Sequence, residues 1–292
     1  HFFVTGKAGT GKSTLLQLFR KTTGKKVVVL SPTGISALNV QGQTIHSFFQ
    51  FPPKLMHQGE IFINKRLVRL LSALDAIIID EVSMVRADVL DAIDYSLKLH
   101  RKSVAPFGGV QMLFFGDLFQ LPPVVSSQEE REYFRTVYPS PYFFDAHIFK
   151  SHVHLVMIEL TRVYRQRERN FIQLLDAIRT MQFDYEELDS LNERYLPDEP
   201  IEEPYLTLCS TNAAAQQINK DRLALLTTPS FYYSGEVKGD FNPKLFPTDY
   251  KLELRLDGQV MLIRNDPEKR FVNGSLARIV GLEEEKIIVS MT

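Results

Sequence analysis

Cysteine, tryptophan and net charge are all scarce in this chain. Its 292 residues include one Cys and no Trp, and its 34 Lys and Arg nearly balance 35 Asp and Glu. A single cysteine cannot build a disulfide framework, so the sequence excludes a disulfide-stapled secreted domain and suggests a reducing compartment. Cys209 lies in an apolar run, where a small buried side chain is the simplest interpretation. A net charge of −1 gives no support by itself for nucleic-acid binding, which would need a local basic surface.

Long hydrophobic runs are absent as well. No run approaches the ~18 apolar residues of a membrane span, and no signal-peptide pattern opens the chain, so the sequence predicts no membrane partner. The chain is 44% hydrophobic, enough for a substantial core, and its length fits two domains. His1 lies almost inside the first expected strand, and 287–292 read as a strand cut short. We therefore expect native sequence to continue beyond both ends.

A phosphate-binding loop stands near the start of the chain. Residues 6–13 read Gly-Lys-Ala-Gly-Thr-Gly-Lys-Ser, between an apolar run at 2–4 and a helical pattern. Its glycines let backbone N–H groups point inward and, with the following helix N-terminus, cradle phosphates. Lys12 can reach the β- and γ-phosphates, and the Ser13 hydroxyl can ligate Mg²⁺. The residues that we assign to nucleotide binding are Gly6, Ala8, Gly9, Thr10, Gly11, Lys12, Ser13 and Thr14.

An apolar strand that ends in two acids supplies the second half of such a site. Residues 76–81 read Ala-Ile-Ile-Ile-Asp-Glu. Asp80 is expected to hold Mg²⁺, and Glu81 to orient and activate an attacking water. The adjacent pair favours hydrolysis over phosphoryl transfer to a small acceptor, because a kinase has no need of a water-activating Glu at that place.

Apolar, β-branched runs alternate with helical patterns along the first half of the chain. The runs cover 2–4, 27–30, 77–79, 112–115 and 153–158. This alternation predicts an α/β fold with parallel strands and crossover helices. Polar loops follow four of the runs, and the carboxyl ends of parallel strands share one edge of a sheet, where ligands bind. The sequence thus predicts a single nucleotide crevice in a first domain over 1–157.

A second α/β unit is expected to follow. Its predicted helices have apolar positions between Phe171 and Met181, and from an N-cap at Asn212 onward. A strand is expected at 206–208 and a loop over about 227–250. Three short strands close the chain, with a turn at Asn273-Gly274. Their expected ranges are 260–263, 276–280 and 286–289.

Further motifs give this chain its family resemblance. The segments are 31–37 (Ser-Pro-Thr-Gly-Ile-Ser-Ala), 44–48 (Thr-Ile-His-Ser-Phe), 80–84 (Asp-Glu-Val-Ser-Met), 114–124 (Phe-Phe-Gly-Asp-Leu-Phe-Gln-Leu-Pro-Pro-Val) and 160–166 (Leu-Thr-Arg-Val-Tyr-Arg-Gln). They resemble motifs Ia, Ib, II, III and IV of the superfamily-one DNA helicases. The stretch from Asp88 through 106–111 is similar to a signature of the Pif family within that superfamily. Residues 258–266 and 272–275 resemble the passage into that family's SH3-like insertion.

The resemblance implies a fold and an activity. The implied fold has two RecA-like parallel-sheet domains, the second incomplete over 158–258, the start of an SH3-like β insertion at 259–292, and a strand-separating wedge near 51–66. The implied activity is an ATP-driven, Mg²⁺-dependent helicase that moves 5′ to 3′ on single-stranded DNA and unwinds forked or structured duplex DNA. Its role would be genome maintenance, including repair, recombination and telomere maintenance. We expect a monomer, cytoplasmic in a bacterium and nuclear or mitochondrial in a eukaryote.

The resemblance also assigns roles to single residues. Gln120 would sense the γ-phosphate, and Arg165 would reach from the second domain as an arginine finger. The DNA contacts implied are Thr33, Gly34, His46, Ser47, Phe48, Thr211 and Asn212. Simpler interpretations compete at each position. Gln120 could be a turn residue, Arg165 part of a solvated basic face, Thr33 a helix cap, and Phe48 a core residue.

Other classes of protein remain open on the sequence. A RecD-like subunit, or a helicase domain fused to a nuclease or relaxase, would share these motifs. A P-loop kinase or transport ATPase would lack the Gly-Asp-x-x-Gln-Leu-Pro-Pro loop of 116–123. A catalytically silent module that binds single-stranded DNA is the non-enzymatic alternative. The family's adenine-reading Gln and its final motifs fall outside this sequence, so we expect residues 1–292 alone to bind ATP or ADP without unwinding a fork.

Overall fold

The structure of the chain is a computed structural model. It describes residues 1–150, 153–166, 168–196, 205–237, 248–264, 266, 268, 270–271 and 274–291. The chain divides into two compact units, His1–Tyr195 and Leu196–Thr292, and each is described by itself. Among the described residues, no helix has the length and apolar character needed to cross a membrane.

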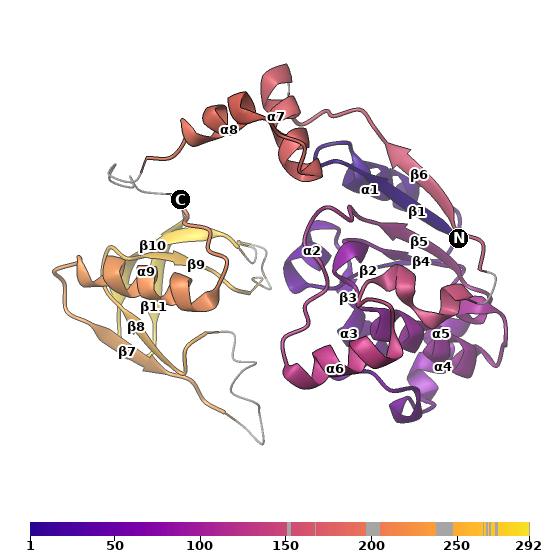
Figure 1. Cartoon of the computed structure of the whole chain (residues 1–292). Helices are drawn as coiled ribbons and strands as arrows, with labels where there is room; N and C mark the ends of the chain where they lie inside the picture. Colours follow the sequence, from indigo (N-terminus) through magenta and orange to yellow (C-terminus); the bar gives the residue numbers. More distant parts are fainter. Residues whose placement is uncertain are drawn as a thin grey trace. The chain divides into compact units, whose positions relative to one another are not determined.

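The first unit is built on a six-stranded parallel sheet (Figure 1). Its strands are β1 (Phe2–Gly6), β2 (Val27–Ser31), β3 (Gln43–Thr44), β4 (Ala76–Ile79), β5 (Gln111–Phe115) and β6 (Val156–Leu160). They lie in the order β3-β2-β4-β5-β1-β6, and every neighbouring pair is parallel. The predicted α/β fold with a parallel sheet is therefore confirmed. The short edge strand β3 was not predicted.

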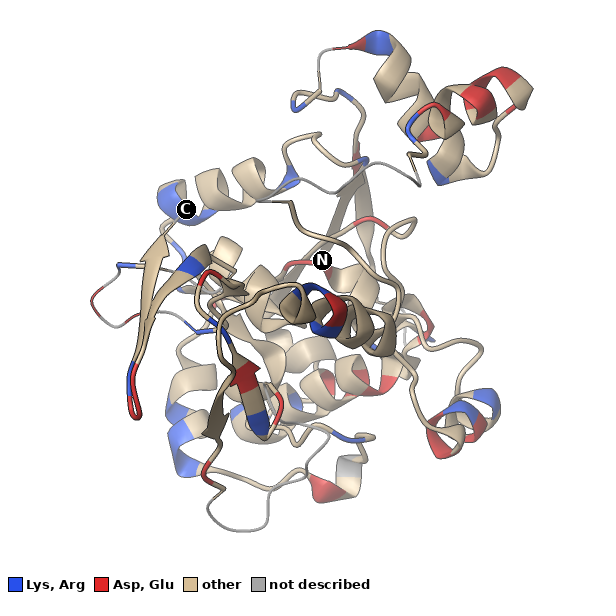
Figure 2. Ribbon diagram, turned by 90° about the vertical axis from the view of Figure 1, so that its left-hand side faces the viewer, with Lys and Arg blue, Asp and Glu red and all other residues tan. Residues whose placement is uncertain are grey.

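Helices connect the strands and cover both faces of the sheet (Figure 1). The α-helices of this unit are α1 (Lys12–Thr22), α2 (Gly34–Asn39), α3 (Ile45–Phe49), α4 (Lys65–Ser72), α5 (Ala87–Arg101), α6 (Gln128–Val137), α7 (Arg169–Thr180) and α8 (Tyr185–Asn192). Short 3₁₀ turns are η1 (Gln58–Glu60), η2 (Val82–Met84), η3 (Pro106–Gly109), η4 (Phe143–Asp145) and η5 (His147–Lys150). Acidic residues are concentrated on α8, whereas residues of both signs of charge are interspersed on other helices (Figure 2).

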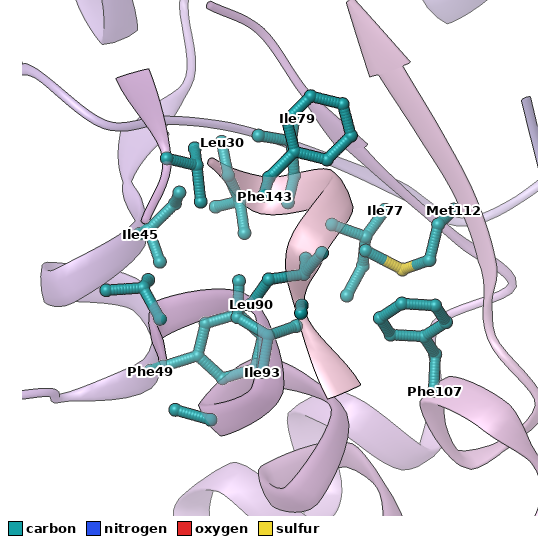
Figure 3. Close-up of a cluster of buried hydrophobic side chains, with 14 of the residues drawn as sticks. Leu30, Ile45, Phe49, Ile77, Ile79, Leu90, Ile93, Phe107, Met112 and Phe143 are labelled. Carbon is teal, nitrogen blue, oxygen red and sulfur yellow. The ribbon is translucent and has the colours of Figure 1, made fainter. Parts of the chain in front are cut away.

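The central strand β4 explains why its sequence is a continuous apolar run. All four of its residues are fully buried, because both faces of a parallel sheet are covered by helices. Successive side chains point to opposite faces, so Ile77 and Ile79 join a large cluster with α5, while Ile78 joins a smaller one with Leu16 of α1. Figure 3 shows the larger cluster, in which Leu90 of α5 packs among Ile77, Ile79 and aromatic rings.

Helix α5 carries three buried carboxylates, of which only Asp88 was named from the sequence, as the start of the family signature. Asp88, Asp91 and Asp94 are spaced by three residues, so they occupy neighbouring positions along the helix. Asp88 accepts the Met56 N–H at 2.9 Å, and Asp94 accepts the Phe107 N–H at 2.7 Å. Each acid therefore stabilises a different loop by accepting its otherwise unpaired backbone N–H.

Asp91 binds the segment that precedes β6 with three hydrogen bonds. Its carboxylate accepts the Tyr138 hydroxyl at 2.9 Å and the backbone N–H groups of His147 and Ile148, each at 3.0 Å. Tyr138 follows α6, and the two backbone donors lie in η5. The segment from 138 to 148 is thereby fixed on α5, just before the chain enters β6.

The second unit contains one long helix and antiparallel strands. Its elements are α9 (Asn212–Ala224), β7 (Phe231–Ser234), β8 (Lys251–Leu254), β9 (Gln259–Met261), β10 (Leu276–Leu282) and β11 (Ile287–Met291). β7 pairs with β8, and the other three strands form a sheet in the order β11-β10-β9. Ala277 and Ile279 on β10 are its most buried apolar residues among those described.

Three predictions for this unit were wrong. Residues 206–208 form no strand, and Leu208 is 93% exposed, because no partner strand pairs with this segment in the described part of the chain. The expected loop over 227–250 contains the aromatic strand β7, whose partner β8 was also missed. The N-cap of α9 is Thr211, not Asn212, since the Thr211 hydroxyl accepts the Ala214 N–H at 3.3 Å. Asn273, half of the expected turn, lies outside the described residues.

The predicted domain boundaries stay predictions. The boundary at 157/158 falls inside β6, whose five residues all pair with β1, and the compact units divide at 195/196. In the described part of 196–292 every strand pair is antiparallel. The incomplete second RecA-like domain and the SH3-like insertion are therefore carried by the resemblance alone.

Candidate nucleotide-binding site

The phosphate loop leaves the carboxyl end of β1 and leads into α1, as predicted. Gly6, Gly9 and Gly11 have φ values of 144°, 81° and 90°, a region that residues with a β-carbon rarely adopt. The Lys12 ammonium lies over the loop and donates to the Gly6 carbonyl at 2.6 Å and the Lys7 carbonyl at 3.1 Å. Lys12 thus points to the concave side of the loop, where it would meet phosphate oxygens.

The acidic pair directly follows β4, two strands away from β1 in the sheet. Asp80 is 6% exposed, and its N–H donates to the Leu30 carbonyl at 2.8 Å. Burial, and then the neighbouring Glu81 carboxylate, raise the pKa of Asp80 to about 6. Glu81 itself has a left-handed backbone with φ 51°, at the turn from β4 into η2. A cation beside this pair would relieve the repulsion between the two acids.

The charges around Lys12 belong to several loops. Burial lowers the pKa of Lys12, while the carboxylates of Asp117, Glu81 and Asp80 act in the opposite direction. These acids follow β4 and β5, and Lys12 follows β1. The sequence patterns predicted that these strand ends share one site, and the structure brings them together.

A magnesium site would use one hydroxyl and one carboxylate of this chain. Ser13, the second residue of α1, has an exposed side chain, and Asp80 is the buried acid that follows β4. No group of three His, Cys, Asp or Glu side chains that could hold a metal occurs among the described residues. Mg²⁺ commonly uses one or two carboxylates and completes its shell with substrate phosphates and water. The residues present therefore fit Mg²⁺ bound with a nucleotide better than a metal bound by the protein alone.

The loop after β5 centres on a buried carboxylate, Asp117, which is 1% exposed. Gln120 donates from Nε2 to Asp117 Oδ2 at 3.1 Å, and the Phe119 N–H donates to Oδ1 at 3.2 Å. Arg179 of α7 donates to Oδ1 from Nη2 at 2.8 Å and to Oδ2 from Nε at 3.3 Å. Burial acts to raise the pKa of Asp117, but Arg179, Phe119 and Gln120 together hold it below its usual value. The sequence motifs predicted a role for Gln120 but not for Asp117 or Arg179, whose pairing spans 62 positions.

The segment after β6 lies against the phosphate loop. The Tyr164 N–H donates to the Gly9 carbonyl at 2.8 Å. A β-carbon at Gly9 would stand 2.7 Å from Arg165 Cβ, so the two backbones approach closely. Arg165 is exposed and belongs to the same compact unit as the phosphate loop, rather than reaching it from a separate unit. Its role as an arginine finger stays a prediction.

The predicted DNA contacts of the first unit have different environments. Thr33 caps α2, because its hydroxyl accepts the Ser36 N–H at 3.3 Å, and Gly34 opens the helix with free space around its α-carbon. Ser47, the third residue of α3, is exposed, whereas His46 is half-buried. Phe48 is 6% exposed and packs edge-on against Phe49 at 5.0 Å between ring centroids. This burial supports the simpler interpretation of Phe48 as a core residue, and its contact with DNA stays a prediction.

The remaining predicted DNA contacts, Thr211 and Asn212, lie at the start of α9 in the second unit. Both side chains are exposed, and the Thr211 hydroxyl is engaged as the helix cap. Their contact with DNA stays a prediction.

A parallel sheet whose strand ends present a phosphate loop, an acidic pair and a polar loop with Gln120 defines a RecA-like P-loop protein. Within that class, the chain belongs to the PIF1-like helicase family, whose model matches residues 1–187. This finding confirms the family resemblance inferred from the motifs.

Relatives and solved structures match nearly the whole chain. The ATP-dependent DNA helicase PIF1 of Saccharomyces cerevisiae is 32% identical over 301 residues, which cover 96% of this chain and 34% of that protein. The structure of the Bacteroides Pif1 helicase in complex with ADP-AlF3 and ssDNA is 39% identical, with a TM-score of 0.84, and is matched over 100% of this chain and 68% of that one. A structure of two coordinating Pif1 helicases on forked dsDNA is 40% identical, with a TM-score of 0.81 and coverage of 100% and 70%. The chain thus spans about a third of the yeast protein's length.

Proposed function

We propose that this chain is the ATP-binding part of a DNA helicase that hydrolyses ATP to move along single-stranded DNA and unwind duplex DNA. One observation carries the proposal. Lys12 of the phosphate loop shares its electrostatic environment with Asp80, Glu81 and Asp117, which come from two other strand ends. The Bacteroides relative in complex with ADP-AlF3 and ssDNA, matched over the whole chain, supports the same assignment.

The residues divide the work of hydrolysis among them. Lys12 would bind the β- and γ-phosphates, and Glu81 would orient the attacking water and accept its proton. Gln120 would contact the γ-phosphate, and Arg165, beside Gly9, would neutralise charge that develops during transfer. Mg²⁺, held by Ser13 and Asp80, would supply positive charge to the phosphate oxygens.

The rival classes gain less support. A small-molecule kinase does not account for the Glu81 carboxylate, nor for the match to a helicase family over residues 1–187. Translocation from 5′ to 3′, action on forked or structured duplex, a monomeric state and a role in genome maintenance rest on the family resemblance. The compartment depends on the source organism, so it stays a prediction.

Two substitutions test the site. In the whole protein, Lys12→Ala should abolish DNA-stimulated ATP hydrolysis, and the matched variant Lys21→Ala, on the exposed end of α1, should keep the parent rate. Glu81→Gln should bind ATP with near-parent affinity but fail to hydrolyse it, because size and hydrogen bonding are kept while the base is lost. Parent-rate hydrolysis by Lys12→Ala would show that the site is misassigned. A parent that binds single-stranded DNA without hydrolysing ATP would instead favour the silent DNA-binding module.

A further inference from the structure

Helix α7 contacts the nucleotide loops at two points on one of its faces. Arg179 pairs with Asp117 at 2.8 Å, and Asp176, three residues earlier, pairs with Lys7 of the phosphate loop. Between these pairs lies a cavity of about 290 Å³, whose walls include Lys7, Ala8 and Gln120. The helix therefore touches both the loop that binds phosphates and the loop that carries the γ-phosphate sensor.

The Asp117 carboxylate uses all of its capacity to accept hydrogen bonds. Its two oxygens receive four hydrogen bonds, two from Arg179, one from the Phe119 N–H and one from the Gln120 amide. A carboxylate offers about four lone-pair sites. Among the three residues that donate these hydrogen bonds only Arg179 is charged, so it is the charged hydrogen-bond partner of this buried carboxylate. Its guanidinium also lies 4.2 Å from the Phe119 ring centroid, so it holds the loop from two sides.

We propose that Arg179 is a positioning residue for Gln120. By neutralising Asp117 and binding it with two hydrogen bonds, Arg179 fixes the carboxylate that orients the Gln120 amide. One Nε2 proton of Gln120 goes to Asp117, so the second proton and the carbonyl oxygen remain for the γ-phosphate and the attacking water. The inference rests on the proposed function, because it requires a nucleoside triphosphate on the phosphate loop.

Loss of Arg179 should change the response to the γ-phosphate and spare the other phosphates. Without the guanidinium, Asp117 is a buried carboxylate that has lost its charged hydrogen-bond donor, so it takes up a proton or pulls the loop toward solvent. Either outcome changes the hydrogen bond that Asp117 receives from Gln120. ADP has no γ-phosphate, and its phosphates are bound by the 6–13 loop, so its affinity should stay near that of the parent.

The test compares the affinity of the chain for ADP with its affinity for a non-hydrolysable ATP analogue. The parent should favour the analogue, and Arg179→Gln should lower that preference on the order of tenfold, the lower end of the effect known for partners that orient metal ligands. Arg179→Lys keeps the charge but loses the two-pronged contact, so its loss should be intermediate. The matched control is Arg169→Gln, at the exposed first turn of the same helix, which should keep the parent's preference.

A double mutant separates positioning from direct contact with the nucleotide. If Arg179 acts through Gln120, adding Arg179→Gln to Gln120→Ala should cause no further loss of the preference. If the fold-losses of the two single variants multiply in the double mutant, Arg179 binds the nucleotide itself and the inference is overturned. It would also be overturned if Arg179→Gln kept the parent's preference, or if it weakened ADP and the analogue equally with a lower melting temperature. The readout needs neither hydrolysis nor unwinding, so failure of helicase activity in the whole protein would count against the proposed function alone.

Discussion

His46 shows how the environment of one side chain changes what it can contribute. It lies half-buried in α3, and burial, with a smaller effect of Arg86, lowers its pKa from the usual 6.5. The imidazole is therefore neutral at physiological pH. If His46 contacts DNA as the resemblance implies, it does so through a hydrogen bond rather than through charge, and it adds nothing to the release of counterions.

The lowered pKa of His46 predicts a pH dependence of stability. The unfolded chain binds the His46 proton more readily than the folded one, so the stabilisation is complete above about pH 6.5 and is lost as the pH falls toward the folded value. Between about pH 7.5 and about pH 5.5, the parent should lose more free energy of unfolding than His46→Gln, as measured by urea denaturation. His154→Gln, at an exposed position, is the control and should behave as the parent. An equal pH dependence in the parent and in His46→Gln would contradict the interpretation.

At the residue scale, sequence patterns predicted the residues of the nucleotide site better than they predicted which side chains are buried. The spacing of Lys12 and Ser13, and the acids after a β-branched run, identified the nucleotide site because backbone geometry ties these residues to strand ends. The sequence left Phe48 open between a DNA contact and a core residue, because an aromatic residue in a short helix has the same local sequence signal whether it faces solvent or core. The pairing of Asp117 with Arg179 could not be predicted from the sequence, since it depends on how α7 packs.

At the scale of elements, α5 organises the first unit through its acids. Burial and the Asp91 carboxylate raise the pKa of Tyr138, so the phenol stays protonated and donates to Asp91. Tyr138→Phe removes that donor and leaves a buried carboxylate less well satisfied. We expect a loss of about 1–2 kcal/mol in the free energy of unfolding, measured by urea denaturation. Tyr142→Phe, on the same segment, is the control. A Tyr138→Phe variant as stable as the parent would show that the hydrogen bond contributes nothing net.

The elements that the sequence predicted best were the buried parallel strands. β2, β4 and β5 agree with the predicted runs to within one residue at each end. The strands of the second unit were harder to predict, because a short antiparallel strand forms only when a neighbouring strand pairs with it. The aromatic run of β7 becomes a strand through pairing with β8, whereas 206–208 has a similar apolar sequence and, among the described residues, no partner.

At the scale of the whole molecule, the near balance of charge limits how DNA can be bound. With a net charge of −1, the chain has no overall attraction for a polyanion, so binding must depend on local phosphate contacts. We predict that the whole protein binds single strands with little sequence preference and weakens steeply between about 50 and 200 mM salt. Fluorescence anisotropy with oligonucleotides of unrelated sequence measures both properties. Tight binding that ignores salt, or a strong preference for one duplex sequence, would argue against a groove that tracks the backbone.

The order of the six strands in the sheet could not be predicted from the sequence either. The runs predicted a parallel sheet, but nothing local states that β1 lies between β5 and β6, or that the chain returns to that edge 150 residues after leaving it. That order is set by which helices can cover which face, a property of the folded whole. It also decides that the segment of Arg165 emerges next to the phosphate loop.

Gly6 carries a consequence for how this protein can evolve. It has a φ of 144°, and a β-carbon there would collide with the carbonyl oxygen of Leu160 on the neighbouring strand β6. Every codon one base away from a glycine codon encodes glycine, a residue with a β-carbon, or a stop. Any amino-acid substitution that a single nucleotide change produces at this position would therefore force β6 to move. Because β6 delivers the Arg165 segment to the phosphate loop, point mutation at this one site would disturb both sides of the nucleotide pocket together.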